Sequence, residues 1–236
     1  MHKVFLPIIM LLASLFSSSV SAQYRKHFTG MLEYKISVRD TSMRGMVPDN
    51  KMIVYTNDTV VRIENFTGNL GKQVAIKHMM MGKSYLLLET DFGKFALQMD
   101  LDEEISSAEP NPNDTVSADA VEYTYKKKCF KRKILGKKVN RIEVSHKDFP
   151  EPIEFLYMKG YSSKIVDAYP DISGIPVRYS VPMTDAVLDY ELVKISEYTP
   201  NRDLFGISDD YERISFDAFM DRLIQSKETM QGENGP

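Results

Sequence analysis

The 236-residue sequence predicts a mainly β protein, with one antiparallel sheet of roughly ten strands and a helix near the C-terminus. Three observations predict this fold class. Apolar and polar residues alternate with a period of two in many short segments. Tight turn pairs join those segments, which favours hairpins over βαβ units. Helical periodicity is convincing in only one place, close to the C-terminus.

Residues 1–22 have the pattern of a secretory signal peptide. Lys3 supplies the positive charge, and the run from Val4 to Phe16 is mostly apolar. Small residues end at Ala22, so we expect cleavage before Gln23. A membrane anchor is the alternative, but the apolar run is shorter than the ~20 residues that span a bilayer. We therefore expect an exported protein, periplasmic, outer-membrane-associated or secreted, with no transmembrane segment after cleavage.

The first half of the mature chain is expected to be a meander. Apolar residues alternate with polar ones from 30 to 38, which predicts a strand with one apolar face. Segments 52–55 and 60–63 flank the turn pair Asn57-Asp58. Segments 74–80, 84–89 and 94–99 continue the pattern. The acidic, proline-containing segment 100–119 lacks periodicity and predicts a mobile loop.

The same strand pattern resumes after this loop. Segments 123–134 and 139–145 predict a second hairpin around residues 135–137, followed by strands at 153–157, 164–168, 175–181 and 186–196. In the last strand, Leu192 is expected on one face and Ile195 on the other. Pro176 and Pro182 place their strand at an edge or at an irregular position.

The single helical pattern begins after Ser215, which can cap a helix. An apolar stripe then follows, made of Phe216, Phe219, Met220, Leu223 and Ile224. We expect this helix to lie on the sheet or across its mouth. Residues 23–227 are thus expected to form one domain, and residues 228–236 a disordered tail.

Composition and motifs exclude several function classes. The formal net charge of −3 gives no general attraction for nucleic acid. No nucleophile elbow, phosphate-binding loop, dinucleotide fingerprint or zinc-ligand spacing occurs, so we expect no catalytic residues, no metal site and no cofactor. The lone Cys129 is expected to be a buried structural thiol, with a reactive thiol as the alternative.

One segment is strongly basic. Between residues 126 and 141 the cationic residues are Lys126, Lys127, Lys128, Lys131, Arg132, Lys133, Lys137, Lys138 and Arg141. A solvated strand edge explains them, because lysines on an edge strand prevent pairing between sheets. A docking surface for an anionic lipid headgroup or an acidic partner is the alternative, as is contact with the acidic segment 100–119.

The chain has an unusual set of large apolar and aromatic side chains. The chain has 14 Met, 13 Tyr and 12 Phe but no Trp. These side chains, including Met79-Met80-Met81, predict either a methionine-rich core or an apolar cavity for an acyl chain or a peptide. The residues expected to face that cavity lie on the more apolar strand faces. They are Tyr34, Ile36, Tyr55, Leu86, Leu88, Phe155, Tyr157 and Leu192.

Four segments resemble secreted Bacteroidetes proteins related to the GLPGLI family, in the lipoprotein-carrier (LolA/LppX-like) superfamily. The matching segments are 28–36 ("F-x-G-x-I-x-Y"), 133–138 ("K-x-I-x-G-[YK]-K"), 171–177 ("G-x-P-L") and 204–211 ("L-F-x-[IV]-P-x-x-Y"). Val139 and Ser208 stand where those patterns have Cys and Pro, and the literal GLPGLI string is absent. The resemblance implies a half-barrel with a helix over its concave face, in which relatives receive acyl chains.

Two hypotheses follow for function, and a hydrolase is a third interpretation that would need a clustered Ser/His/Asp set in a cleft. The first is a non-enzymatic envelope protein that binds a lipid or an acyl chain in the half-barrel. The second is an interaction or scaffold subunit of an envelope complex, with a packed core and a basic docking hairpin at 126–141. An empty apolar cavity favours the first hypothesis and a filled interior favours the second.

Overall fold

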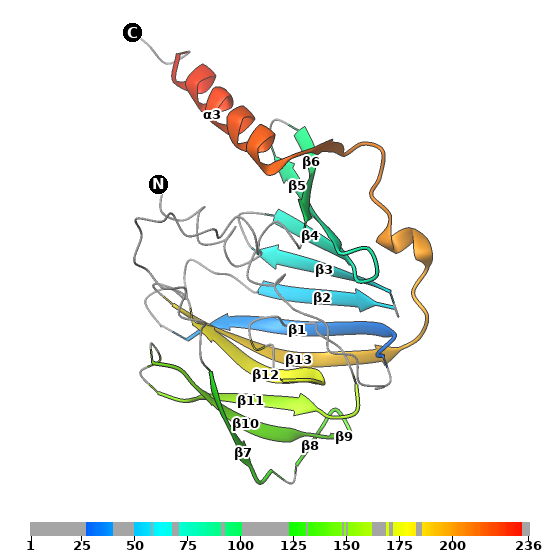
Figure 1. The fold of residues 1–236 in the computed structure, drawn as a ribbon, viewed down its shortest axis with the longest axis vertical. Coiled ribbons are helices and arrows are strands. Elements are labelled where there is room, and N and C mark those ends of the chain that lie inside the picture. The colour runs from blue at the N-terminus through cyan, green and yellow to red at the C-terminus, as the bar shows by residue number, and fades with distance from the viewer. Residues whose placement is uncertain are drawn as a thin grey trace, which may run out of the picture.

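The computed structural model has one large curved sheet that stays open, with a helix at its C-terminal end (Figure 1). This confirms the predicted fold class. The structure describes residues 27–39, 50–57, 59–67, 71–90, 93–100, 123–130, 132–147, 149, 151–161, 169, 172–182 and 186–232. The predicted signal peptide, nearly all of segment 100–119 and the strand expected at 164–168 lie outside the described residues.

Twelve strands of the described residues form the sheet, in the order β14-β6-β5-β4-β3-β2-β1-β13-β12-β11-β10-β7. Neighbours are antiparallel except β14, which runs parallel to β6. A separate two-stranded hairpin, β8 (Lys133–Ile134) and β9 (Lys137–Lys138), confirms the turn predicted at 135–137. The strands of the sheet are β1 (Gly30–Val38), β2 (Asn50–Thr56), β3 (Val60–Thr67), β4 (Gly71–His78), β5 (Lys83–Thr90), β6 (Gly93–Asp100), β7 (Thr124–Lys128), β10 (Asn140–Ser145), β11 (Ile153–Met158), β12 (Ile175–Pro182), β13 (Val187–Glu197) and β14 (Glu212–Ile214).

The alternation in the sequence sets the two faces of the sheet. In β1, Leu32, Tyr34 and Ile36 are buried, whereas Lys35 and Ser37 between them are exposed. We call the face that carries Leu32, Tyr34 and Ile36 the inner face. It holds the largest group of buried side chains, drawn from strands β1 to β4 and β10 to β13, so the main core lies there.

A bulge in β13 changes which of its side chains point inwards. Tyr34 pairs with Leu192 and Glu33 pairs with Lys194, which leaves Val193 as an extra residue. An extra residue reverses the faces of the side chains that follow it. Leu192 and Ile195 therefore both belong to the inner core, although simple alternation places them on opposite faces.

The prolines of β12 lie in the interior of the sheet, between β11 and β13, so they do not mark an edge. The alternative of an irregular position is confirmed for Pro176. The register with β11 shifts there, because Tyr157 pairs with Pro176 while Leu156 pairs with Arg178. A bulge tolerates the missing N–H group of proline in an interior strand.

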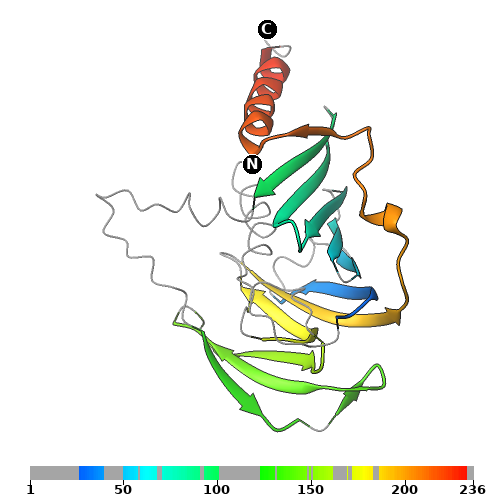
Figure 2. The same ribbon diagram turned by 45° about the vertical axis from the view of Figure 1, so that its right-hand side comes forward.

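The outer face is partly covered by the segment from Thr199 to Tyr211, which we call the connector. It contains a 3₁₀ helix, η3 (Arg202–Phe205), and runs up one side of the sheet to β14 (Figure 2). Its Ile207 and Tyr211 side chains pack on an outer cluster of Val74, Ile76, Leu87 and Ala96. The connector thus covers part of the outer face of β4 to β6.

Helix α3 (Phe216–Gly232) starts where the sequence predicts, because the Ser215 hydroxyl accepts a hydrogen bond from the Ala218 N–H at 3.2 Å. Only part of the predicted stripe is buried. Phe219 packs on Phe95 of β6 with ring centroids 5.4 Å apart, whereas Phe216 and Ile224 are exposed. The helix also continues to Gly232, which corrects the disordered tail expected from residue 228.

The strand expected at 74–80 ends earlier, at His78. Residues 79–82 form the turn to β5, and Gly82 adopts φ +62°, a conformation that favours glycine. The Met79-Met80-Met81 side chains are therefore exposed at the turn, and the expectation that they belong to a core is wrong. Buried methionines do occur elsewhere on the sheet, at Met52 and Met158.

Candidate functional site

Five of the eight residues expected to line a cavity gather in the inner core. Tyr34 and Ile36 come from β1, Phe155 and Tyr157 from β11, and Leu192 from β13. Each has an exposed fraction of 9% or less. Their strands lie close together because β13 joins β1 to β12, and β12 joins β13 to β11. The apolar faces read from the sequence therefore meet on one side of the sheet.

Aromatic rings fill the interior around these residues. Tyr179 of β12 and Tyr190 of β13 stack with ring centroids 4.6 Å apart. The Tyr179 ring also lies 5.6 Å from Phe155 and 6.2 Å from Tyr34. The Tyr34 hydroxyl donates a hydrogen bond to the Pro176 carbonyl at 2.9 Å. Because these side chains contact one another, they form a packed core in this part of the sheet.

Burial also fixes the chemistry of the core tyrosines. It raises the pKa of Tyr34, Tyr179 and Tyr190 well above the usual value of 10. Desolvation disfavours the phenolate because the charged form loses its hydration. The phenols thus stay protonated at neutral pH, where they can donate hydrogen bonds but cannot act as bases.

The other three proposed cavity residues lie elsewhere. Leu86 is buried and Leu88 half-buried in a second cluster, with Phe95 and Phe219, under the start of α3. Tyr55 lies on the outer face, so its inward placement is wrong. Its neighbour Val54 takes the inner position of β2.

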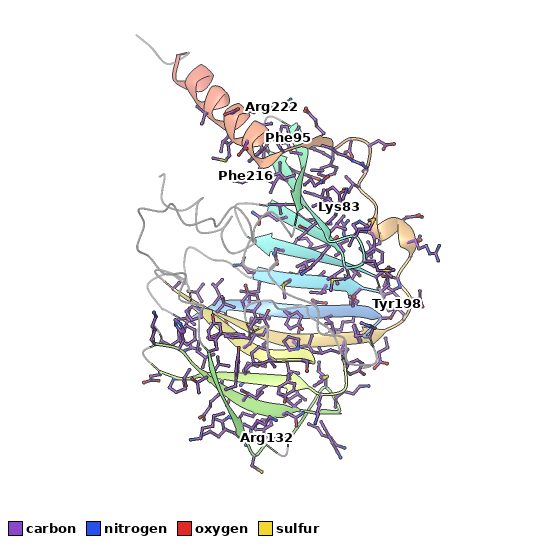
Figure 3. All side chains as sticks on the ribbon, viewed as in Figure 1. Lys83, Phe95, Arg132, Tyr198, Phe216 and Arg222 are labelled. Carbon is purple, nitrogen blue, oxygen red and sulfur yellow. The ribbon has the colours of Figure 1, made fainter. Side chains whose placement is uncertain are left out.

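The basic residues predicted between 126 and 141 lie at one end of the molecule, and we call this surface the basic edge. Arg132 marks it in Figure 3, at the end opposite Arg222. Lys126, Lys127 and Lys128 lie on β7, the terminal strand of the described sheet. Lys133, Lys137 and Lys138 lie on the β8–β9 hairpin, Arg141 lies on β10, and Lys131 is outside the described residues.

Carboxylates neutralise part of the basic edge. Lys128 contacts Glu143 at 2.7 Å, Arg141 contacts Glu154 at 2.8 Å, and Lys137 contacts Glu197 at 2.9 Å. The Lys128 ammonium lowers the pKa of Glu143, and Glu197 raises the pKa of Lys137. Glu143 and Lys137 therefore hold their charges at neutral pH.

Four lysines of the basic edge remain available. Lys126, Lys127, Lys133 and Lys138 are exposed, and none has a carboxylate within ion-pair distance in the part of the chain that the structure describes. The Arg132 guanidinium is also exposed and lies 6.0 Å from the ring centroid of Phe130. Exposed cations grouped on a terminal strand and a projecting hairpin can attract an anionic partner.

An open pocket of about 540 Å³ lies between the outer face and the connector. Sequence reasoning missed it, since its lining comes from turns and from the connector. The lining residues are Asn57, Thr59, Val60, His78, Thr199, Pro200, Arg202, Phe205 and Gly206. None of the eight proposed cavity residues is among them.

Groups that carry chemistry are sparse in the described ranges. There, no three His, Cys, Asp or Glu side chains are close enough to share a metal ion. Cys129 is exposed, which corrects its expected burial. Burial lowers the pKa of His78, so its imidazole is neutral at pH 7. No helix among the residues described has the length and apolar character needed to cross a membrane.

Comparison with known proteins identifies no family for this chain. No family model matches the chain, and no curated protein matches it. Among solved structures, the chain is similar to the β-barrel-like protein of domain of unknown function DUF1849 from Brucella abortus. The identity is 12% and the TM-score 0.33, over 74% of this chain and 100% of that one. None of these comparisons points to the GLPGLI family or to Bacteroidetes.

Proposed function

We propose that this chain is an exported, non-enzymatic interaction module that docks an acidic protein partner through the basic edge. One observation carries the proposal, namely a group of exposed lysines that have no ion-pair partner among the described residues. They are Lys126, Lys127, Lys133 and Lys138. The filled interior around Tyr179 supports it, because a packed core leaves the surface as the place for recognition.

The geometry of β7 favours a protein over a lipid headgroup. β7 pairs with β10 on one side and ends the described sheet on the other. The backbone groups of such an edge can bind an added strand from a partner. An acidic strand would also meet the ammonium groups of Lys126 and Lys127. Hydrogen bonding and charge therefore act at the same place.

Charge reversal tests this proposal. The triple variant Lys126→Glu, Lys127→Glu, Lys133→Glu is compared with Lys35→Glu, Lys159→Glu, Lys194→Glu, which changes the net charge equally at exposed sites off the basic edge. A photo-crosslinker placed at Thr124 reports partner contact in native envelope extracts. We expect a salt-sensitive cross-link to an acidic segment that the first triple loses and the second keeps. Equal cross-linking by both triples would overturn the proposal.

The second candidate is an envelope carrier for a lipid or an acyl chain, as the GLPGLI-like segments imply. It would require the inner face that carries Tyr34, Phe155 and Leu192 to open, because these side chains pack in the core of the described structure. The test is mass spectrometry of the protein purified without detergent and then denatured. A stoichiometric acyl species supports the carrier, and a protein free of lipid contradicts it. The same spectrum tests export, because a mature chain should begin at Gln23.

A further inference from the structure

The turn between β4 and β5 holds three consecutive methionines in solvent. The exposed fractions of Met79, Met80 and Met81 are 38%, 82% and 59%. Exposed apolar side chains are common singly, but three together at a turn call for a reason. By contrast, Met52 and Met158 are only 3% and 2% exposed. The methionines of the turn are therefore exposed to solvent, whereas Met52 and Met158 are buried in the core.

Two backbone hydrogen bonds fix this turn. The Met81 N–H donates to the His78 carbonyl at 3.2 Å, which closes the chain into a tight turn. The Met79 N–H donates to the Thr59 carbonyl at 2.8 Å, which ties the turn to the neighbouring β2–β3 connection. A turn of this kind brings the Cα atoms of its first and fourth residues within about 7 Å, so residues 78–81 occupy a short stretch of the surface.

The imidazole of His78 stands at the start of the same turn. Its ring meets Tyr85 edge-on, with centroids 6.1 Å apart and planes at 89°. It also borders the open pocket beside Thr59 and Val60, so it stays partly accessible. A neutral imidazole ring has a lone pair that can bind a metal ion.

We propose that His78, Met79, Met80 and Met81 form a binding site for a soft monovalent cation, with Cu⁺ as the ligand and Ag⁺ as its redox-inert substitute. Thioether sulfur is a soft donor that selects Cu⁺, and imidazole binds copper well. The site offers only neutral side-chain donors, one histidine and three methionines. Hard divalent ions need oxygen ligands, which this set does not provide. The site therefore selects by softness and not by charge.

The test uses the full mature chain with the background change Cys129→Ser, because that exposed thiol would also bind Cu⁺. Cu⁺ is titrated under anaerobic, reducing conditions against a chromophoric chelator, and native mass spectrometry with Ag⁺ counts bound ions. We expect one ion per chain. Met79→Leu, Met80→Leu, Met81→Leu should abolish that binding, and His78→Gln should weaken it by at least about 10-fold.

The matched control is Met52→Leu with Met158→Leu, which removes two buried thioethers. Circular dichroism verifies that every variant folds. If the turn variant binds as much Cu⁺ as the control, or if both lose it equally, the proposal is wrong. Leucine keeps the apolar surface of the turn, so a loss of Cu⁺ binding in the turn variant reports the missing sulfur atoms and not a lost apolar surface.

Discussion

Tyr179 and Tyr190 are register partners on β12 and β13, and their rings stack with centroids 4.6 Å apart and planes within 4°. Both side chains are nearly fully buried. This stack joins the strands that carry Phe155 on one side and Tyr34 on the other. It is the centre of the aromatic core, so its removal should destabilise the fold.

Tyr179→Ala should lower the free energy of unfolding by about 3–5 kcal/mol, because it removes a large ring from a packed core. Urea unfolding followed by circular dichroism measures the loss. Tyr198→Ala is the control, since that ring is 46% exposed, and should change stability by less than about 0.5 kcal/mol. Similar losses in the two variants would contradict a packed interior.

The buried tyrosines predict an alkaline transition. Burial raises the pKa of Tyr34, Tyr179 and Tyr190 above their unfolded values near 10. The folded state thus retains protons that the unfolded state releases, so stability is fully present below about pH 10 and falls as the pH rises further. The part of the tyrosinate absorbance that these three buried rings contribute should appear together with the loss of circular dichroism. Complete ionisation of all tyrosines in a chain that stays folded would refute this.

Arg62 links the sheet to the connector. Its Nε donates to Glu64 at 2.8 Å and its Nη1 donates to the Leu204 carbonyl at 3.0 Å. Arg62→Met should cost about 3–5 kcal/mol, because it leaves the buried Glu64 carboxylate with only the half-exposed Lys72 as partner. Limited proteolysis should then cut the connector faster.

The double variant Arg62→Met, Glu64→Leu provides the control for that experiment. It removes both buried charges, so it should recover much of the stability. The Leu204 carbonyl still lacks its donor, and connector cleavage should stay fast. If the double variant is as unstable as the single one, the ion pair is not the cause.

Two glycines hold positions that no other residue fits. A Cβ at Gly30 would lie 2.0 Å from the Ser196 carbonyl oxygen, and one at Gly174 would lie 2.5 Å from the Met158 carbonyl oxygen. Their φ angles are +148° and +133°. Gly30→Ala and Gly174→Ala should therefore destabilise the protein strongly.

Gly136→Ala is the control for both glycine variants. Gly136 also has a positive φ, but a Cβ there would contact nothing within 4 Å. Its cost should stay near the 1–3 kcal/mol of backbone strain alone. The measurement is again the free energy of unfolding, and a cost as large as that of Gly30→Ala would refute the steric argument.

Local patterns predicted the parts of the fold that depend on neighbours in sequence. The Asn57 side chain accepts hydrogen bonds from the N–H groups of Thr59 and Val60, which forms the predicted turn. Ser215 caps the helix as expected. The alternation in β1 gives the correct buried face because nothing interrupts it.

Local patterns do not predict how segments that are far apart in the sequence pair with one another. The bulge at Val193 depends on how β13 meets β1, and it turns Ile195 inwards against its local alternation. Hydrogen bonds to residues far away in the sequence position the connector. The Leu204 carbonyl accepts one from Arg62, and the Tyr211 hydroxyl donates one to Glu89. Periodicity also could not reveal that strand β4 stops at His78, since the methionines that follow are as apolar as a strand interior.

The central ladder of the sheet joins the two ends of the domain, because β1 pairs with β13 and Gly30 meets Glu197. Hairpins within residues 30–100 can form from local contacts as the chain emerges. One side of β1 nevertheless has no partner until residues 187–197 have been made. Such long-range closure makes folding slow. Until those residues are in place, the free edge of β1 can pair with a strand of another chain, so aggregation competes with folding.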